Sequence, residues 1–244
     1  MSKIIKRDVV YEDEGRRLFG YFCIPAEAQE ARPGILLIHD AFGIGDYIRG
    51  RAERLAALGY AVLAADVWGD GATLGDEGTI RATIGRFAGD RAMWFGRLRA
   101  GYDALVAQPG VDPTRTAAVG YCFGGASVLE FARLGGSVRG VVSFHGGLDL
   151  VGAEWSAGKT VAKVLITTGF EDPLAPQATL RKLETAMSEA GIDWEVDCYS
   201  HTRHAFTRVD AATTGRPEMV AYDERADRRS WRAMIDFLDE VLGR

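Results

Sequence analysis

The sequence predicts an alternating α/β fold with a mostly parallel central sheet and helices on both faces. Short apolar runs alternate with stretches of helical periodicity, which is typical of buried parallel strands linked by helices. The 30 glycines among 244 residues also favour an α/β fold, since such folds need many tight turns. There is no internal repeat or low-complexity linker, so we expect a single domain over residues 1–244 without a large cap domain.

The individual elements follow from the same patterns. An N-terminal β-hairpin is expected, with strands at 8–11 and 17–25 and a turn at 12–15. Short apolar strands are expected at 34–38, 60–64, 116–120, 138–144, 162–168 and 194–199. Helices are expected at 48–58, 91–107, 125–134, 176–190 and 222–242. The first of these stops at Gly59, a typical helix end. The polar stretch 68–91 is expected to be a loop with a short helix.

Composition excludes several classes of protein. The formal net charge is −5, whereas a nucleic-acid-binding protein normally carries a basic excess. No apolar run is long enough to span a bilayer, and the basic N-terminus is not followed by the apolar core of a secretory signal. The cysteines, Cys23, Cys122 and Cys198, are odd in number and lack CxxC spacing, so neither a disulfide framework nor a zinc site is expected. No other metal and no cofactor is expected either. A reducing cytoplasm fits this pattern best.

The motif Gly120-Tyr-Cys-Phe-Gly-Gly125 lies between an expected strand and an expected helix. It fits the G-x-nucleophile-x-G elbow, with cysteine where serine is common. The turn is so tight that it admits only small neighbours such as Gly120 and Gly124. It points the nucleophile at the N-terminus of the next helix, whose partial positive charge favours a thiolate. Cys122 is therefore interpreted as a nucleophile rather than a buried packing cysteine.

In folds with this elbow, an acid and then a histidine follow the nucleophile along the chain. His204, past the last expected strand, is the candidate base, and Asp172, directly after the strand before it, is the candidate acid. Asp149 is the alternative acid. His201 is expected to be a loop residue, and His145 a turn or core residue because it would precede the acid.

The loop His39-Asp-Ala-Phe-Gly43 follows the strand 34–38. In this architecture one oxyanion-hole N–H comes from that loop and another from the residue after the nucleophile. Ala41 and Phe123 are therefore the expected backbone donors, and Asp40 is expected beside the nucleophile.

Four motifs in this order resemble the dienelactone hydrolase family of α/β-hydrolases: Gly120–Gly125, Asp172–Pro176, His204–Arg208 and Asp40–Gly43. The resemblance extends from about Arg17 to the terminal helix, and four ordered motifs are more specific than any one of them. It implies the α/β-hydrolase fold and a triad of Cys122, Asp172 and His204. It also implies a carboxylic ester hydrolase similar to carboxymethylenebutenolidase, which cleaves a small ester or lactone through a thioester acyl-enzyme.

The resemblance extends to residues around the triad. The family usually has glutamate at Asp40, where the carboxylate helps to ionise the thiol when substrate binds. If the shorter Asp40 reaches the sulfur, this switch is expected to persist; if not, the histidine alone forms the thiolate–imidazolium pair. Arg208 matches one of two arginines that bind a substrate carboxylate in the type member, and Arg81, Arg86 and Arg91 compete for the other.

Substrate and partners are less defined by the sequence. Aromatic residues at the expected mouth, among them the predicted substrate contacts Phe42 and Tyr121, suggest a small apolar or aromatic-derived acyl group. The expected partner is this small molecule, with no nucleic acid or membrane, and the protein is expected to be a monomer or small homo-oligomer. A cysteine amidotransferase-like enzyme is an alternative, but such sites pair the cysteine with His-x-Glu, and this chain has His204-Ala-Phe. The other alternative is a non-enzymatic sensor or interaction module, against which the complete triad argues.

Overall fold

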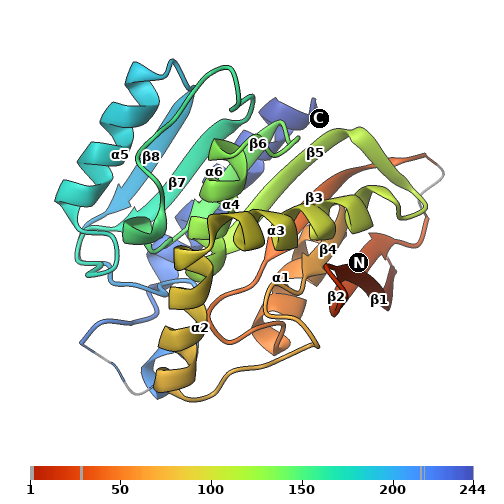
Figure 1. The fold of residues 1–244 in the computed structure, drawn as a ribbon, viewed down its shortest axis with the longest axis horizontal. Coiled ribbons are helices and arrows are strands. Elements are labelled where there is room, and N and C mark those ends of the chain that lie inside the picture. The colour runs from red at the N-terminus through yellow and green to blue at the C-terminus, as the bar shows by residue number, and fades with distance from the viewer. Residues whose placement is uncertain (1–2, 28–29, 215, 217, 244) are drawn as a thin grey trace. The chain divides into compact units, whose positions relative to one another are not determined.

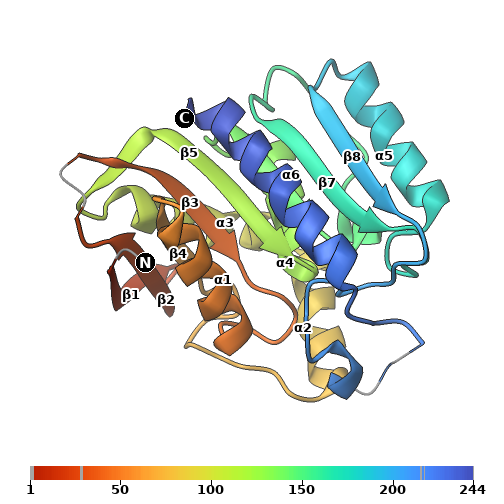
Figure 2. The same ribbon diagram turned by 180° about the vertical axis from the view of Figure 1, so that it is seen from behind.

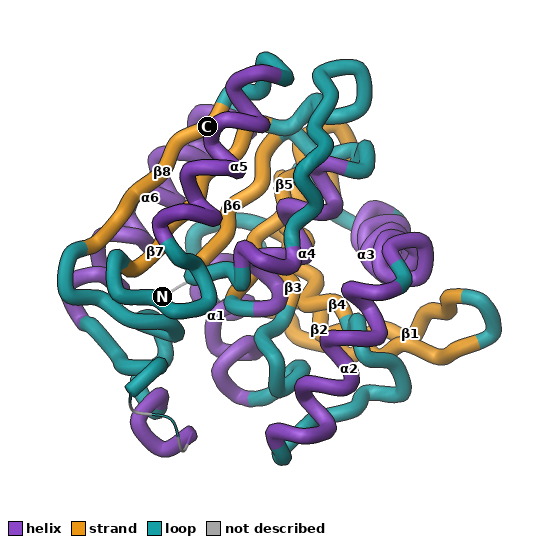
Figure 3. The backbone as a smooth tube through the Cα atoms, turned by 60° about the vertical axis from the view of Figure 1, so that its left-hand side comes forward, coloured by secondary structure: helices purple, strands orange, loops and turns teal. Residues whose placement is uncertain are grey.

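The structure is a computed structural model that describes residues 3–27, 30–214, 216 and 218–243. The chain forms two compact units, Met1–Ala118 (unit 1) and Val119–Arg244 (unit 2). Strands and helices alternate along both units, which Figure 3 shows in orange and purple. The predicted α/β character is therefore present in each unit.

Unit 1 begins with the predicted hairpin. Its strands β1 (Ile4–Asp13) and β2 (Arg16–Pro25) pair antiparallel along their whole length. Glu14 and Gly15 form the connecting turn, and both have positive φ angles, 48° and 79°. Two positive φ angles are typical of the two-residue turn whose twist fits a hairpin. On its other side, β2 pairs antiparallel with β4 (Ala61–Ala65).

The remaining strands of unit 1 are parallel. β4 pairs in parallel with β3 (Arg32–Ile38), and the strand order within the unit is β1-β2-β4-β3-β5. β5 (Val111–Tyr121) continues across the boundary into unit 2. Helices α1 (Asp46–Ala57) and α3 (Arg91–Val106) cover opposite faces of these strands (Figures 1 and 2). β4 is buried along its whole length, as expected for a parallel strand covered on both faces.

Two elements of unit 1 differ from the prediction. The stretch 68–91 contains a full helix, α2 (Glu77–Gly89), which begins where the Asp76 side chain accepts a hydrogen bond from Thr79 N at 2.9 Å. Phe87 is its one buried residue, so the apolar periodicity that reveals a helix in sequence is missing. β5 begins at Val111, five residues before the predicted start; its first residues are mostly polar and only partly buried, so they lack the apolar pattern of the rest of the strand.

Unit 2 has parallel strands in the order β6-β7-β8. Its main elements are α4 (Phe123–Arg133), β6 (Gly140–Phe144), β7 (Lys163–Gly169), α5 (Gln177–Glu189), β8 (Trp194–Tyr199) and α6 (Glu224–Leu242). Two short 3-10 helices, η1 (Leu148–Leu150) and η2 (Ala211–Thr214), lie in its loops. In Figures 1 and 2, α4 and α6 lie on opposite faces of β6 and β7. The loops after β5, β7 and β8 carry the three predicted triad residues, all within unit 2.

No helix in the described part of the chain is both long enough and apolar enough to cross a membrane.

Candidate active site

Cys122 occupies the sharp turn between β5 and α4, as the elbow motif predicts. Its backbone has φ 56° and ψ −114°, a conformation that L-residues rarely adopt. Cys122 N donates a hydrogen bond to Phe144 O, at the end of β6, at 3.0 Å. Its side chain is half-buried, whereas Cys23 is buried and Cys198 is exposed. A strained cysteine at a helix N-terminus is the arrangement expected of a nucleophile.

The glycines around Cys122 permit the close approach of its neighbours. A Cβ on Gly120 would lie 1.9 Å from Gly124 O. A Cβ on Gly125 would lie 2.7 Å from Ser143 Oγ and 2.8 Å from Gly146 Cα. These distances are far below van der Waals contact, so any larger residue would push the turn apart. The predicted need for small residues holds at Gly120 and extends to Gly125.

Asp172 and His204 form a buried hydrogen-bonded pair. Asp172 follows β7, and His204 lies in the loop after β8. His204 Nδ1 lies 2.8 Å from Asp172 Oδ2, and the side chains are only 3% and 0% exposed. Leu174 N donates to the other carboxylate oxygen at 2.8 Å. Because a carboxylate can only accept, Nδ1 carries a proton and Nε2 is left for chemistry.

The charges around His204 favour its protonated form. Burial lowers the pKa of His204, but the charges of Cys122 and Asp172 and their hydrogen bonding outweigh burial and raise the pKa to about 10. Nε2, the other ring nitrogen, is buried, and the Cys122 side chain is the group that acts on it. The thiol and the imidazole of unit 2 therefore interact electrostatically, and the imidazole can exchange a proton at Nε2.

His201 and His145 lie in different surroundings. His201 is exposed, with Nδ1 3.3 Å from Glu171 Oε1, which agrees with a loop residue. His145 is buried, as expected of a core residue, but its ring lies against His204, with centroids 5.1 Å apart. Its position beside the candidate base is invisible in the sequence, because His145 lies 59 residues before it.

Two predicted substrate contacts of unit 2 have partners within the protein. Tyr121 is fully buried and stacks on Phe144, with ring centroids 4.6 Å apart. The prediction that the Tyr121 ring contacts substrate is therefore corrected, because the ring belongs to the core. Arg208 Nε lies 2.8 Å from Asp210 Oδ1, and Nη2 donates to Oδ2 at 3.1 Å. Asp210 lies two positions after Arg208, and this short spacing is the signal in the sequence that could have indicated the pair.

The loop with Asp40, Ala41 and Phe42 belongs to unit 1. Asp40 is buried, and its Oδ1 accepts a hydrogen bond from Phe42 N at 2.9 Å. His39 Nε2 accepts from Val67 N at 3.2 Å, so Nδ1 carries the proton and donates to Asp40 O at 2.7 Å. Burial lowers the pKa of His39, which agrees with this neutral form. His39 thus braces the loop, a role that the sequence analysis did not assign.

The candidate arginines for a substrate carboxylate also lie in unit 1. Arg81 is exposed and forms an ion pair with Glu77 one helical turn away. The guanidinium groups of Arg86 and Arg91 lie over the rings of Phe87 and Trp94. These contacts are structural and single out none of the three arginines for substrate.

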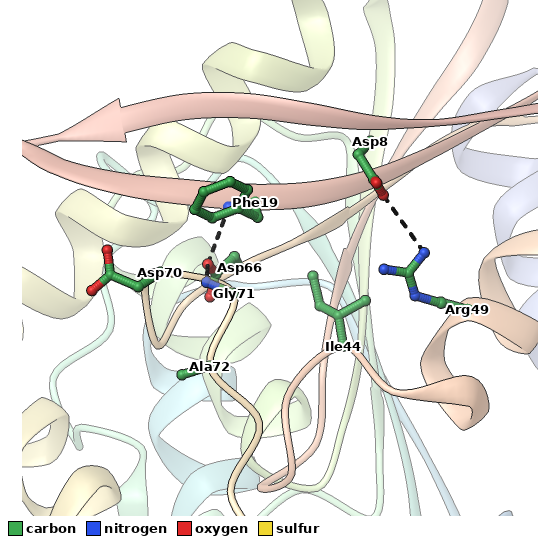
Figure 4. Close-up of a pocket in the computed structure, with 8 residues that line it drawn as sticks. All are labelled: Asp8, Phe19, Ile44, Arg49, Asp66, Asp70, Gly71 and Ala72. Atoms are coloured by element: carbon green, nitrogen blue, oxygen red, sulfur yellow. Dashed lines mark hydrogen bonds and ion pairs between the residues drawn. The ribbon is translucent and has the colours of Figure 1, made fainter.

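Unit 1 also contains a cavity of about 270 Å³ (Figure 4). Its lining residues are Asp8, Phe19, Ile44, Arg49, Asp66, Asp70, Gly71 and Ala72. The carboxylates of Asp66 and Asp8 are already engaged, by Phe19 N at 3.1 Å and by Arg49 at 3.6 Å. None of the predicted site residues lines it. Across the described residues, no three His, Cys, Asp or Glu side chains form a group that could hold a metal ion.

The elbow and the buried acid–histidine pair, in this chain order, define an α/β-hydrolase. The chain matches the family model of the dienelactone hydrolase family over residues 18–242, and it belongs to that family. The fold and family predicted from the four motifs are confirmed.

Individual relatives agree with this assignment. A metagenomic protein described as a dienelactone hydrolase-like promiscuous phosphotriesterase has a TM-score of 0.92 and 39% identity, with 98% of each chain covered. A Klebsiella pneumoniae structure described as "Putative Dienelactone Hydrolase", at 23% identity, has a TM-score of 0.80 over 97% of this chain and 98% of its own, which shows the fold. A Synechocystis protein named "Putative carboxymethylenebutenolidase" is 25% identical over 81% of this chain and 85% of its own.

The elbow geometry predicts that Gly120→Ala is strongly destabilising. Its Cβ would overlap Gly124 O, so we expect a loss of about 3 kcal/mol or more of unfolding free energy in urea. Gly85→Ala in α2 is the matched control, because a Cβ there meets nothing within 4 Å and alanine favours a helix by up to about 1 kcal/mol. Equal unfolding midpoints for the two variants would contradict the clash.

The charge of Cys122 is predicted to hold the pKa of His204 up. In Cys122→Ala one of the two charges that oppose the effect of burial is gone, so the pKa of His204 is expected to fall. The measurement is an NMR titration of the His204 ring protons. Cys198→Ala, which removes an exposed cysteine, is the control and should leave the titration unchanged. An equal pKa of His204 in the wild type and in Cys122→Ala would show that the Cys122 side chain and the His204 imidazole do not interact.

Proposed function

We propose that this protein hydrolyses a small carboxylic ester or lactone through a thioester on Cys122. The observation that carries the proposal is the buried hydrogen bond between His204 Nδ1 and Asp172, together with the effect of the Cys122 charge on the pKa of His204. A thiol, an imidazole and a carboxylate so related are the groups that nucleophilic acyl transfer requires. Membership of the dienelactone hydrolase family supports the same reaction class.

The first half of the reaction makes the acyl-enzyme. The Cys122 thiolate attacks the carbonyl carbon, and the backbone N–H of Phe123, the first residue of α4, helps to hold the resulting oxyanion. The intermediate collapses with cleavage of the C–O bond. The leaving alkoxide takes the proton from Nε2 of the His204 imidazolium, which leaves a neutral imidazole and a thioester. In a lactone the alcohol formed stays attached to the acyl group.

The second half regenerates the enzyme. Neutral His204 removes a proton from water, and the resulting hydroxide attacks the thioester carbonyl. The C–S bond breaks, the carboxylic acid is released, and Cys122 returns as a thiolate beside the imidazolium. Asp172 keeps Nδ1 protonated and orients the ring in both halves, because its second oxygen is fixed by Leu174 N.

The positive charge of Arg208 favours a substrate that carries a negative charge. We propose that Arg208 binds a carboxylate on the acyl group, as the family resemblance implies. Its guanidinium is already beside the carboxylate of Asp210, so an anionic substrate must compete with Asp210. Asp210 is exposed and can turn into solvent when it is displaced.

A second activity is supported by one comparison. The structure at 39% identity is described as a promiscuous phosphotriesterase. We propose that the same thiolate also attacks the phosphorus of aryl phosphotriesters, with the aryloxide as leaving group. Carboxylic esters remain the main proposal, because the family model and the Synechocystis relative point to them.

Loss of the nucleophile is predicted to abolish turnover. Cys122→Ala should remove activity toward a panel of aryl esters, lactones and an aryl phosphotriester while the far-UV circular dichroism stays unchanged, since the elbow accepts small residues. Cys122→Ser should lose at least about 100-fold in kcat but not all activity, because a hydroxyl depends wholly on His204 for its deprotonation. Wild-type turnover by Cys122→Ala would refute the assignment.

Labelling of the wild type provides a control on the same assignment. Burial raises the pKa of Cys23 to about 11, and desolvation also raises the pKa of Cys198. Both are therefore expected to be thiols near neutral pH and to react slowly. Limiting iodoacetamide should label Cys122 first in peptide mapping.

Asp40 is predicted to restrain the thiolate until substrate binds. If the Asp40 carboxylate reaches the sulfur, like-charge repulsion disfavours the thiolate, and Asp40→Asn should then speed iodoacetamide inactivation of the free enzyme and slow ester turnover. The measurement is the rate of iodoacetamide inactivation of the wild type and of Asp40→Asn, from about pH 5 to about pH 9. Overlapping curves and equal turnover would leave His204 as the one group that controls the thiol.

A further inference from the structure

His145 has a backbone conformation that its sequence position does not explain. It follows β6 directly, is buried, and has a φ of 39°, in the left-handed region that favours glycine. A bulky residue held in this region costs about 1–3 kcal/mol, and such strain is concentrated at functional sites. The two residues after it are glycines, which could adopt such a conformation freely. The mechanism above assigns His145 no role.

The end of β6 is joined to all three segments that carry the triad. Phe144 O accepts the hydrogen bond from Cys122 N at 3.0 Å. The next residue, His145, donates its backbone N–H to Thr167 O at 2.8 Å, on the strand that leads to the acid. The His145 Nε2 atom is 2.7 Å from Thr207 Oγ1, three residues after the candidate base. Residues 144 and 145 therefore connect the elbow, β7 and the histidine loop.

The His145 ring contacts the candidate base directly. The rings of His145 and His204 meet edge to face, with centroids 5.1 Å apart and planes 69° apart. Phe206 packs against His145 in the same manner, with ring centroids 5.1 Å apart and planes 82° apart. The bond to Asp172 fixes one atom of the His204 ring, Nδ1, but a single hydrogen bond leaves the ring free to tilt about it. Contact with a second ring fixes the plane, and with it the direction of Nε2.

We propose that His145, anchored by Thr207, is a positioning residue that sets the plane of the His204 imidazole and so aims Nε2 at Cys122. The inference rests on the proposed thiol mechanism, and it assigns to Thr207 the role of holding His145 in place. It explains why a strained histidine stands where a glycine would fit without strain. The ionisable groups packed around His145 are His204, with its partners Cys122 and Asp172, and Tyr121, whose ring centroid lies 5.9 Å away.

The test removes the anchor without changing its shape. Thr207→Val is isosteric and removes the hydroxyl that binds His145 Nε2. We expect kcat for an aryl ester to fall by about 10- to 100-fold with KM nearly unchanged, because a misaimed Nε2 affects proton transfer more than binding. The pH profile of iodoacetamide inactivation should move to higher pH, because the thiolate loses an aligned imidazolium. Thr207→Ser restores a hydroxyl and should recover both properties.

Two further variants make the result decisive. His145→Asn suits the left-handed backbone but is too short to contact His204 and Thr207 together, so it should reproduce the effect of Thr207→Val. Thr202→Val is the matched control: it lies in the same loop and is also buried, but its hydroxyl binds Ser200 O and Asp223 Oδ2 instead. It should keep the wild-type kcat and pH profile even if its melting temperature falls.

The outcomes separate this inference from the proposed function. If wild-type enzyme is inactivated at Cys122 but Thr207→Val keeps its kcat and pH profile, or behaves like Thr202→Val, the positioning role is wrong and the thiol mechanism stands. If Cys122→Ala retains turnover, the proposed function itself is wrong. If His145→Asn fails to fold, the comparison of Thr207→Val with Thr207→Ser still decides the question.

Discussion

The left-handed backbone of Cys122 is the constraint on which the rest of the candidate site depends. At φ 56° a cysteine is strained by about 1–3 kcal/mol, and this must be offset by its surroundings. The bond from Cys122 N to Phe144 O and the start of α4 hold it, and Gly120 lets the chain pass Gly124 O without a clash. As a result the half-buried sulfur lies at the end of β5, at the N-terminus of α4.

Burial of Asp172 and His204 is a second constraint on the site. Removing ionised groups from water costs several kcal/mol for each group unless it gains partners. Each carboxylate oxygen of Asp172 has a donor, Leu174 N or His204 Nδ1, so the charge is compensated. At the other ring nitrogen of His204, Nε2, the charge and hydrogen bonding of Cys122 compensate the imidazolium. The pair is thus both a stable buried interaction and a proton carrier for the proposed hydrolysis.

Local packing decides which neighbours of the triad remain free to meet a substrate. Tyr121 and Phe206 pack around His145 in the core of unit 2, and Arg208 is engaged by Asp210. In unit 1, the Asp66 carboxylate accepts hydrogen bonds from the backbone of Phe19, Gly69 and Gly71 and shapes the loop after β4. These contacts explain why residues near a motif in sequence need not face its substrate.

The sequence by itself determined the fold class, the family and the order of Cys122, Asp172 and His204, because these rest on local signals. Apolar strands, glycine stops and a strand–turn–helix motif are readable within a few residues. It did not show the left-handed backbone of His145, its contact with His204 or the burial of Tyr121. These features depend on residues that are far apart in the chain. The helix expected within 68–91 was predicted to be short, and the full length of α2 was not predicted, because Phe87 is its one buried residue and the helix has no apolar face. Such features were decided by tertiary structure alone, since ring packing and backbone strain exist only once distant segments have come together.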